Sequence, residues 1–148
     1  MDGKGLVFID ANIFLEFFLG DAHADVAEIF LKRVRDKEVS AVTSDFIIYT
    51  CLLQIQRKVK KVHVMREFIL FVNQLDGLTL LRPSLEEIYD AIKMSDTYQL
   101  DFDDSLVVSC MRANNIKTLI SLDTDFDKVS VIKRISPEKH DWQSPLTS

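Results

Sequence analysis

The feature of this chain that most restricts its fold is the regular alternation of short apolar runs with longer amphipathic segments. Four runs rich in β-branched and aromatic residues have the length of buried strands: 6–9, 39–43, 78–81 and 118–121. Strands that alternate with helices form parallel βαβ units, with helices on both faces of one sheet. The pattern therefore predicts an α/β fold with a central parallel sheet. A fifth, short strand is expected over 129–132.

Six segments between and beside these runs have apolar residues at helical spacing. They cover 10–18, 22–37, 46–60, 62–75, 85–98 and 104–113. Residues that favour helix N-termini precede three of them, namely Ser44 with Asp45, Ser84, and Asp103. We therefore expect Asp103 to cap the last of these helices.

The length of 148 residues fits one domain. We expect this domain to span 1–135. The segment 136–148 holds two of the three prolines and has little periodicity, so it is expected to be a loose C-terminal tail. The formal net charge of −5 discourages non-specific adhesion to nucleic acid, although a local basic groove is compatible with it.

The cysteine content and the length of the apolar runs predict a cytoplasmic protein. Cys51 and Cys110 lie far apart in apolar helical segments, as expected of buried thiols in a reducing compartment. The chain has too few cysteines and histidines for the usual kind of zinc site. No signal peptide is visible, and no apolar run reaches the roughly 20 residues that span a bilayer. A membrane partner is therefore not expected.

Acidic residues gather where the predicted strands end. Asp10 follows the first strand directly, Asp123 and Asp125 follow the fourth, and Asp104 opens the helix before the fourth. Ligands in open α/β sheets bind beyond the carboxyl ends of the strands. Clustered carboxylates repel one another unless a cation lies between them, and Mg²⁺ and Mn²⁺ prefer such oxygen ligands. The pattern therefore favours metal-dependent hydrolysis of phosphodiester bonds.

Other roles for the acidic residues remain open at this point. Asp45 and Asp103 read as helix caps, and Asp101 and Asp127 as solvated side chains. A different class of function is a phosphatase or receiver-like domain in which Asp10 is phosphorylated. No lysine after a late strand supports that alternative.

Three segments of the chain together resemble the PIN domain family, the nucleases that include VapC-type toxins of prokaryotic toxin–antitoxin pairs. They are Val7–Ile13, Asp104–Ser109 and Leu119–Phe126, and their order and spacing agree over about 6–132. The resemblance implies a three-layer α/β/α sandwich with a central parallel sheet of four to five strands. It also implies a Mg²⁺- or Mn²⁺-dependent endoribonuclease that acts on RNA, forms a homodimer and is inhibited by an antitoxin protein.

The same resemblance assigns roles to the four acids. It implies that Asp10, Asp104 and Asp123 bind the metal, and that Asp125 completes the catalytic set as the second member of a closing pair. Which member of that pair is the closing ligand stays open. Asn12 and Ser121 would orient the carboxylates, as hydrogen-bond partners of metal ligands do, and Ser44 and Thr50 would support the site in the same way.

One position departs from the family pattern. The family usually has a glutamate in the helix after the second strand, about six residues beyond a serine equivalent to Ser44, and this chain has Thr50 there. A threonine hydroxyl can hydrogen-bond a water but carries no charge. The site is therefore expected to be one acid short, and the alternative function is a catalytically weakened PIN-fold module that binds RNA or protein.

Two further stretches suggest interaction surfaces. Arg57, Lys58, Lys60 and Lys61 begin the densest basic stretch and are expected to contact RNA phosphates, although a solvated helix end is the simpler interpretation. The helix over 62–75 has more apolar residues than one core face needs. An exposed remainder would favour a homodimer or an antitoxin surface.

Overall fold

The computed structural model describes residues 5–137, which form a five-stranded parallel sheet in the order β3-β2-β1-β4-β5. The strands are β1 (Val7–Ile9), β2 (Ala41–Ser44), β3 (Leu78–Leu81), β4 (Thr118–Ile120) and β5 (Lys133–Ile135). The helices are α1 (Ala11–Leu19), α2 (Ala24–Arg35), α3 (Asp45–Val59), α4 (Val62–Asn73), α5 (Leu85–Tyr98) and α6 (Phe102–Ala113). A short 3₁₀ helix, η1 (Thr124–Lys128), connects β4 to β5.

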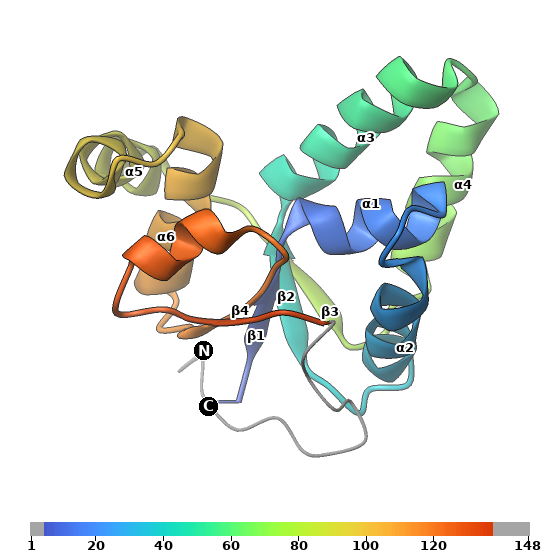
Figure 1. The fold of residues 1–148 in the computed structure, drawn as a ribbon, viewed down its shortest axis with the longest axis horizontal. Coiled ribbons are helices and arrows are strands. Elements are labelled where there is room, and N and C mark those ends of the chain that lie inside the picture. Colours follow the sequence, from blue (N-terminus) through green and yellow to red (C-terminus); the bar gives the residue numbers. More distant parts are fainter. Residues whose placement is uncertain (1–4, 138–148) are drawn as a thin grey trace.

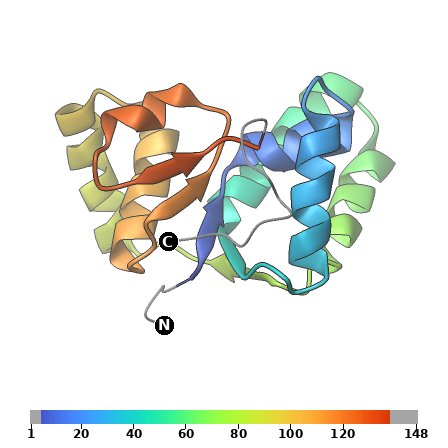
Figure 2. The ribbon, with the colours of Figure 1, turned by 60° about the horizontal axis from the view of Figure 1, so that its bottom comes forward.

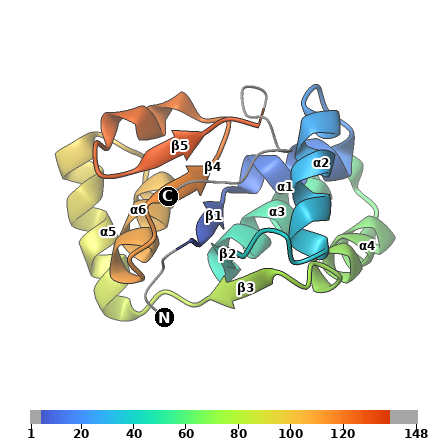
Figure 3. The ribbon, with the colours of Figure 1, turned by 90° about the horizontal axis from the view of Figure 1, so that it is seen from below.

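The sheet lies between two layers of helices. Figure 3 shows α5 and α6 on one face and α1 to α4 on the other, and Figure 1 shows the two groups diverging above the carboxyl ends of the strands. Turning the molecule, as in Figure 2, keeps the same separation. The predicted three-layer α/β/α sandwich with a parallel sheet is therefore confirmed.

The central position of β1 follows from its sequence. All three of its residues are buried, as a strand covered on both faces requires. The chain proceeds from β1 to β2 and β3 on one side, and then crosses to β4 and β5 on the other. The direction of strand order thus reverses between β1 and β4. Open α/β sheets bind their ligands at such a switch point.

Two sequence expectations about local structure are wrong. The fifth strand is Lys133–Ile135 and not 129–132, because Val129 and Ile132 donate backbone hydrogen bonds within the turn that follows η1. Their apolar side chains indicated burial, and a turn provides it as well as a strand does. The N-cap of α6 is Asp101 and not Asp103, which lies in the first turn of the helix.

Much of the apolar surplus on α4 packs α4 against α1. Phe68 is fully buried, and the rings of Phe14 and Phe18 meet it edge-on at centroid distances of 6.4 and 5.3 Å. Phe17 and Phe71 form a further pair at 5.1 Å. Such aromatic pairs each add about 0.5–1.5 kcal/mol beyond the area they bury. The surplus is therefore only partly core. Phe68 is buried, four apolar residues are partly buried against the core, and three are exposed: Val64, Met65, Phe71 and Val72 in the first group, and Val62, Ile69 and Leu70 in the second.

Three remaining expectations concern the cysteines, the membrane and the tail. Cys51 and Cys110 are buried and unpaired, as predicted. No helix within residues 5–137 has the length and apolarity needed to cross a bilayer. The predicted loose tail, 136–148, lies outside the described residues except for Ser136 and Pro137.

Candidate metal centre

Asp10 is a buried carboxylate at the junction of β1 and α1. It is 6% exposed and is the N-cap of α1, where its Oδ1 accepts a hydrogen bond from the backbone N–H of Ala11 at 2.8 Å. Its Oδ2 accepts hydrogen bonds from Ser121 Oγ at 2.7 Å and from Asn12 Nδ2 at 3.2 Å. Both oxygens are therefore held in fixed directions.

Asn12 and Ser121 connect the end of β1 to the end of β4. Asn12 Oδ1 accepts a hydrogen bond from the backbone N–H of Leu122 at 3.2 Å, and its Nδ2 also contacts Ser121 Oγ at 3.2 Å. Ser121 Oγ in turn accepts a hydrogen bond from the backbone N–H of Asp123 at 3.0 Å. One serine hydroxyl thus touches the backbone or side chain of two of the four predicted site acids.

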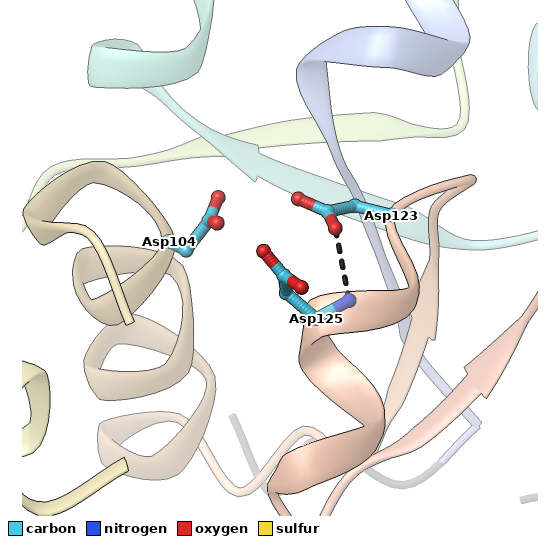
Figure 4. Close-up of side chains that lie close together, drawn as sticks. All are labelled: Asp104, Asp123 and Asp125. Atoms are coloured by element: carbon cyan, nitrogen blue, oxygen red, sulfur yellow. Dashed lines mark hydrogen bonds between the residues drawn. The ribbon is translucent and has the colours of Figure 1, made fainter. Parts of the chain in front are cut away.

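Three of those acids converge from two elements. One carboxylate oxygen from each of Asp104, Asp123 and Asp125 lies within 4.8 Å of the others, as Figure 4 shows. Asp104 projects from the first turn of α6, whereas Asp123 and Asp125 lie at the start of η1. The backbone N–H of Asp125 donates to Asp123 Oδ1 at 2.9 Å. Asp10 is not in this group, although its charge interacts with Asp104 and Asp123.

The site strongly disfavours its own negative charge. Burial raises the pKa of Asp104 to about 8, with further contributions from the charges of Asp103, Asp10 and Asp123. Burial also raises the pKa of Asp10, against the lowering effect of its hydrogen bonds to Ser121 and Ala11. Three convergent carboxylates, one of which carries this penalty, fit a hard divalent cation, which would offset the repulsion and take oxygen ligands.

Asp103 is a residue that the sequence analysis placed outside the site. Its charge contributes to the raised pKa values of both Asp10 and Asp104, and its Oδ1 accepts a hydrogen bond from the backbone N–H of Asp104 at 3.0 Å. The sequence pattern predicts Asp103 as the N-cap of the helix, and so does not predict its contribution to the site. With Asp101 as the N-cap, Asp103 falls in the first helical turn beside Asp104.

Two predicted residues make local contacts instead of contacts with the acids. Ser44 Oγ caps α3 by accepting from the backbone N–H of Ile47 at 3.2 Å. Thr50 Oγ1 donates to the backbone oxygen of Phe46 at 2.9 Å within α3. The hydroxyl of Thr50 is thus engaged with its own helix, and the position contributes no charge to the site.

The predicted RNA-binding residues lie at the far end of α3. Arg57, Lys58, Lys60 and Lys61 are exposed where α3 ends and α4 begins. Since α3 starts at β2 and has 15 residues, its two ends are about 22 Å apart. Figure 1 shows this tip at the distal end of the α3–α4 pair. The tip and the acids would therefore contact different parts of a nucleic acid.

Comparison with protein families gives one match: a family model described as PIN domain covers residues 7–132. No curated protein matches the chain. Several solved structures share the fold at low sequence identity.

One similar structure is a chain of VapBC2 from Rickettsia felis, solved bound to a DNA fragment from its promoter, with a TM-score of 0.70 and 15% identity over 88% of this chain and 98% of that one. Another is VapC20 of Mycobacterium tuberculosis, described as a toxin that cleaves the sarcin–ricin loop, with a TM-score of 0.66 and 17% identity over 82% and 92%. A third is a chain of a toxin–antitoxin complex from Klebsiella pneumoniae, with a TM-score of 0.66 and 15% identity over 88% of this chain and 97% of that one. Identities this low establish the fold alone.

The raised pKa values predict a dependence of stability on pH and metal. Because the folded state holds protons on Asp10 and Asp104 more tightly than the unfolded chain does, this stabilisation is complete below about pH 4. It is lost as pH rises towards about 8, the pKa of Asp104. The melting temperature of chelator-treated protein should therefore fall across this range, and Mn²⁺ should raise it more at the upper end.

Asp104→Asn should flatten the fall and remove most of the Mn²⁺ effect, whereas Asp76→Asn, an exposed position in the α4–β3 turn, should change neither. A melting temperature of the treated protein that is constant over this pH range, measured by calorimetry, would contradict the assignment.

Proposed function

This chain belongs to the PIN domain family, and we propose that it is a divalent-metal-dependent endoribonuclease that acts as the toxin of a toxin–antitoxin pair. The observation that carries the proposal is the convergence of Asp104, Asp123 and Asp125 at the switch point of the sheet. The structural likeness to toxin–antitoxin proteins supports the same interpretation at the level of the fold.

In this proposal Asp104, Asp123 and Asp125 hold a Mg²⁺ or Mn²⁺ ion, and Asp10 contributes its charge beside them. Such an ion activates water and stabilises charge on a phosphate that is attacked in line. The protein's own residues fix the geometry. Ser121 and Asn12 hold the Asp10 carboxylate, and Ser121 also fixes the backbone of Asp123.

The first test is cleavage of single-stranded RNA in the presence of Mg²⁺ or Mn²⁺. Asp104→Asn should lower kcat at least about 100-fold, because even the partners that orient metal ligands are worth 10–100-fold. Asp76→Asn is the matched control and should cleave normally. Cleavage by Asp104→Asn at the normal rate would refute the assigned site.

The second candidate function is a PIN-fold module that binds RNA or protein without cutting, and Thr50 favours it. The same assay separates the two functions. If the native chain binds RNA but does not cleave it, and Thr50→Glu cleaves, the missing carboxylate accounts for the loss. If the native chain cleaves, the three convergent acids suffice without a charge at position 50.

We also propose that the basic tip, residues Arg57, Lys58, Lys60 and Lys61, contacts RNA phosphates away from the cut site. Replacing Lys58 and Lys61 by glutamine should raise KM several-fold, leave kcat unchanged, and reduce the salt dependence of log K by roughly 0.7 for each phosphate that the variant no longer neutralises. Lys117→Gln with Lys133→Gln removes the same charge at the amino ends of β4 and β5, and should change nothing. An unchanged salt dependence in the tip variant would contradict the proposed role of the tip.

Finally, we propose that the protein is a homodimer and that an antitoxin covers the exposed apolar part of α4. Leu85, Tyr89 and Ile92 follow one stripe of α5 and are 85%, 61% and 57% exposed. Such a stripe can pack against its own copy across a two-fold axis.

Sedimentation equilibrium should show that the native chain is a dimer. The double variant Tyr89→Glu with Ile92→Glu should be a monomer, while the double variant Val62→Glu with Leu70→Glu on α4 should stay dimeric. A monomeric native chain would exclude this interface.

A further inference from the structure

Arg134, a residue of β5, forms hydrogen bonds at both ends of the segment 121–127, which carries Asp123 and Asp125. Its Nη1 donates to the backbone oxygen of Ser121 at 3.1 Å, at the start of the segment. Its Nε and Nη2 donate to Asp127 Oδ1 and Oδ2 at 2.9 and 3.1 Å, at the other end. Asp123 and Asp125 lie between these two anchor points. A single guanidinium therefore closes the loop that holds them.

The three hydrogen bonds of Arg134 have the features of a strong interaction. The Arg134 side chain is only 12% exposed, whereas the Asp127 side chain is 56% exposed, so the guanidinium is the shielded side of this ion pair. The two parallel hydrogen bonds to Asp127 match the planar fork of a guanidinium, which a lysine ammonium cannot reproduce. The third bond goes to a backbone oxygen, and so ties the main chain itself and not only a side chain.

The hydrogen bonds inside the loop depend on where its ends are held. Asp123 N–H donates to Ser121 Oγ, and Asp125 N–H donates to Asp123 Oδ1. At its start the loop is fixed by Ser121 Oγ, which donates to Asp10 Oδ2, and by the backbone N–H of Leu122, which donates to Asn12 Oδ1. At its far end, Lys128 Nζ donates to the backbone oxygen of Gln99 at 3.2 Å, and this contact is exposed. Among these links, Arg134 is the one that joins the two ends of the loop to each other, because it bonds both Ser121 and Asp127.

We propose that Arg134 is a positioning residue of the acidic site, which sets the distance of Asp123 and Asp125 from Asp104 by clamping Ser121 and Asp127. It touches none of the reacting groups, and its effect on the metal passes through the loop. The part of this inference that concerns metal affinity rests on the proposed function, whereas the clamp itself is a property of the metal-free protein.

The experiment compares Arg134→Gln, Arg134→Lys and Asp127→Asn with a matched control in the full chain. Arg33 provides the control, because its side chain is 18% exposed and pairs with Glu38 at 3.3 Å. It belongs to α2, a helix that Figure 3 shows apart from β5. Three quantities are measured: backbone amide exchange at Asp123 and Asp125 without metal, the Kd for Mn²⁺ by calorimetry, and kcat and KM for RNA.

For Arg134→Gln we expect faster amide exchange at both acids and a Kd for Mn²⁺ about 10-fold higher or more, as for other residues that orient metal ligands. The value of kcat should fall while KM for RNA stays constant. Arg134→Lys should lie between Arg134→Gln and the native chain, and Asp127→Asn should show the same changes in weaker form. Arg33→Gln should lower the melting temperature without altering amide exchange in the loop or the Kd.

Each outcome bears on a separate statement. Unchanged amide exchange in Arg134→Gln overturns the clamp, even if the protein cleaves RNA. Full recovery by Arg134→Lys overturns the role of the guanidinium fork. A loss of Mn²⁺ affinity in Arg33→Gln equal to that in Arg134→Gln would reduce the effect to general destabilisation and also overturns the proposal. If the native chain binds no Mn²⁺, the proposed function fails while the exchange data still test the clamp.

Discussion

The carboxylate of Asp10 stands where the first strand, the first helix and the fourth strand meet, and the arrangement around it depends on how its two oxygens are used. Oδ1 caps α1, while Oδ2 accepts hydrogen bonds from Ser121, which follows β4, and from Asn12 in the first turn of α1. A buried carboxylate with no partners would be costly. Here hydrogen bonds partly compensate that cost, and the same bonds align the ends of β1 and β4.

In the acidic cluster, the fold holds carboxylates together against their mutual repulsion, which a bound cation would reduce. The fold places Asp104, Asp123 and Asp125 close together although burial and neighbouring charges oppose the ionisation of Asp104. Hydrogen bonds in the loop and the fork of Arg134 hold two of them in position. Thr50, whose hydroxyl is occupied within α3, adds no charge to this balance. The metal affinity that we propose and the repulsion would therefore be set by the same few carboxylates.

The sequence predicted what depends on local pattern and strand order. Asp10, Asp104 and Asp123 follow or precede strands, so the edge at which they gather could be foreseen. Asp103 was misassigned because a cap and a first-turn residue differ by only one or two positions. The pattern misplaces β5 because a short apolar run in a turn, of which only Val129 is buried, resembles a strand. No pattern points to Arg134, because a pairing with Asp127 and Ser121 across η1 has no signature in the linear sequence.

The bond between Asn12 and Ser121 joins residues 109 positions apart, and this separation has a consequence during translation. A ribosome delivers the amino-terminal Asp10 long before it delivers β4. Until Ser121, Asp123 and Asp125 leave the exit tunnel, the growing chain has β1 to β3 and α1 to α6 but lacks two of the three acids of its cluster. The site of the proposed ribonuclease is therefore complete only after β4 and the start of η1 have been synthesised.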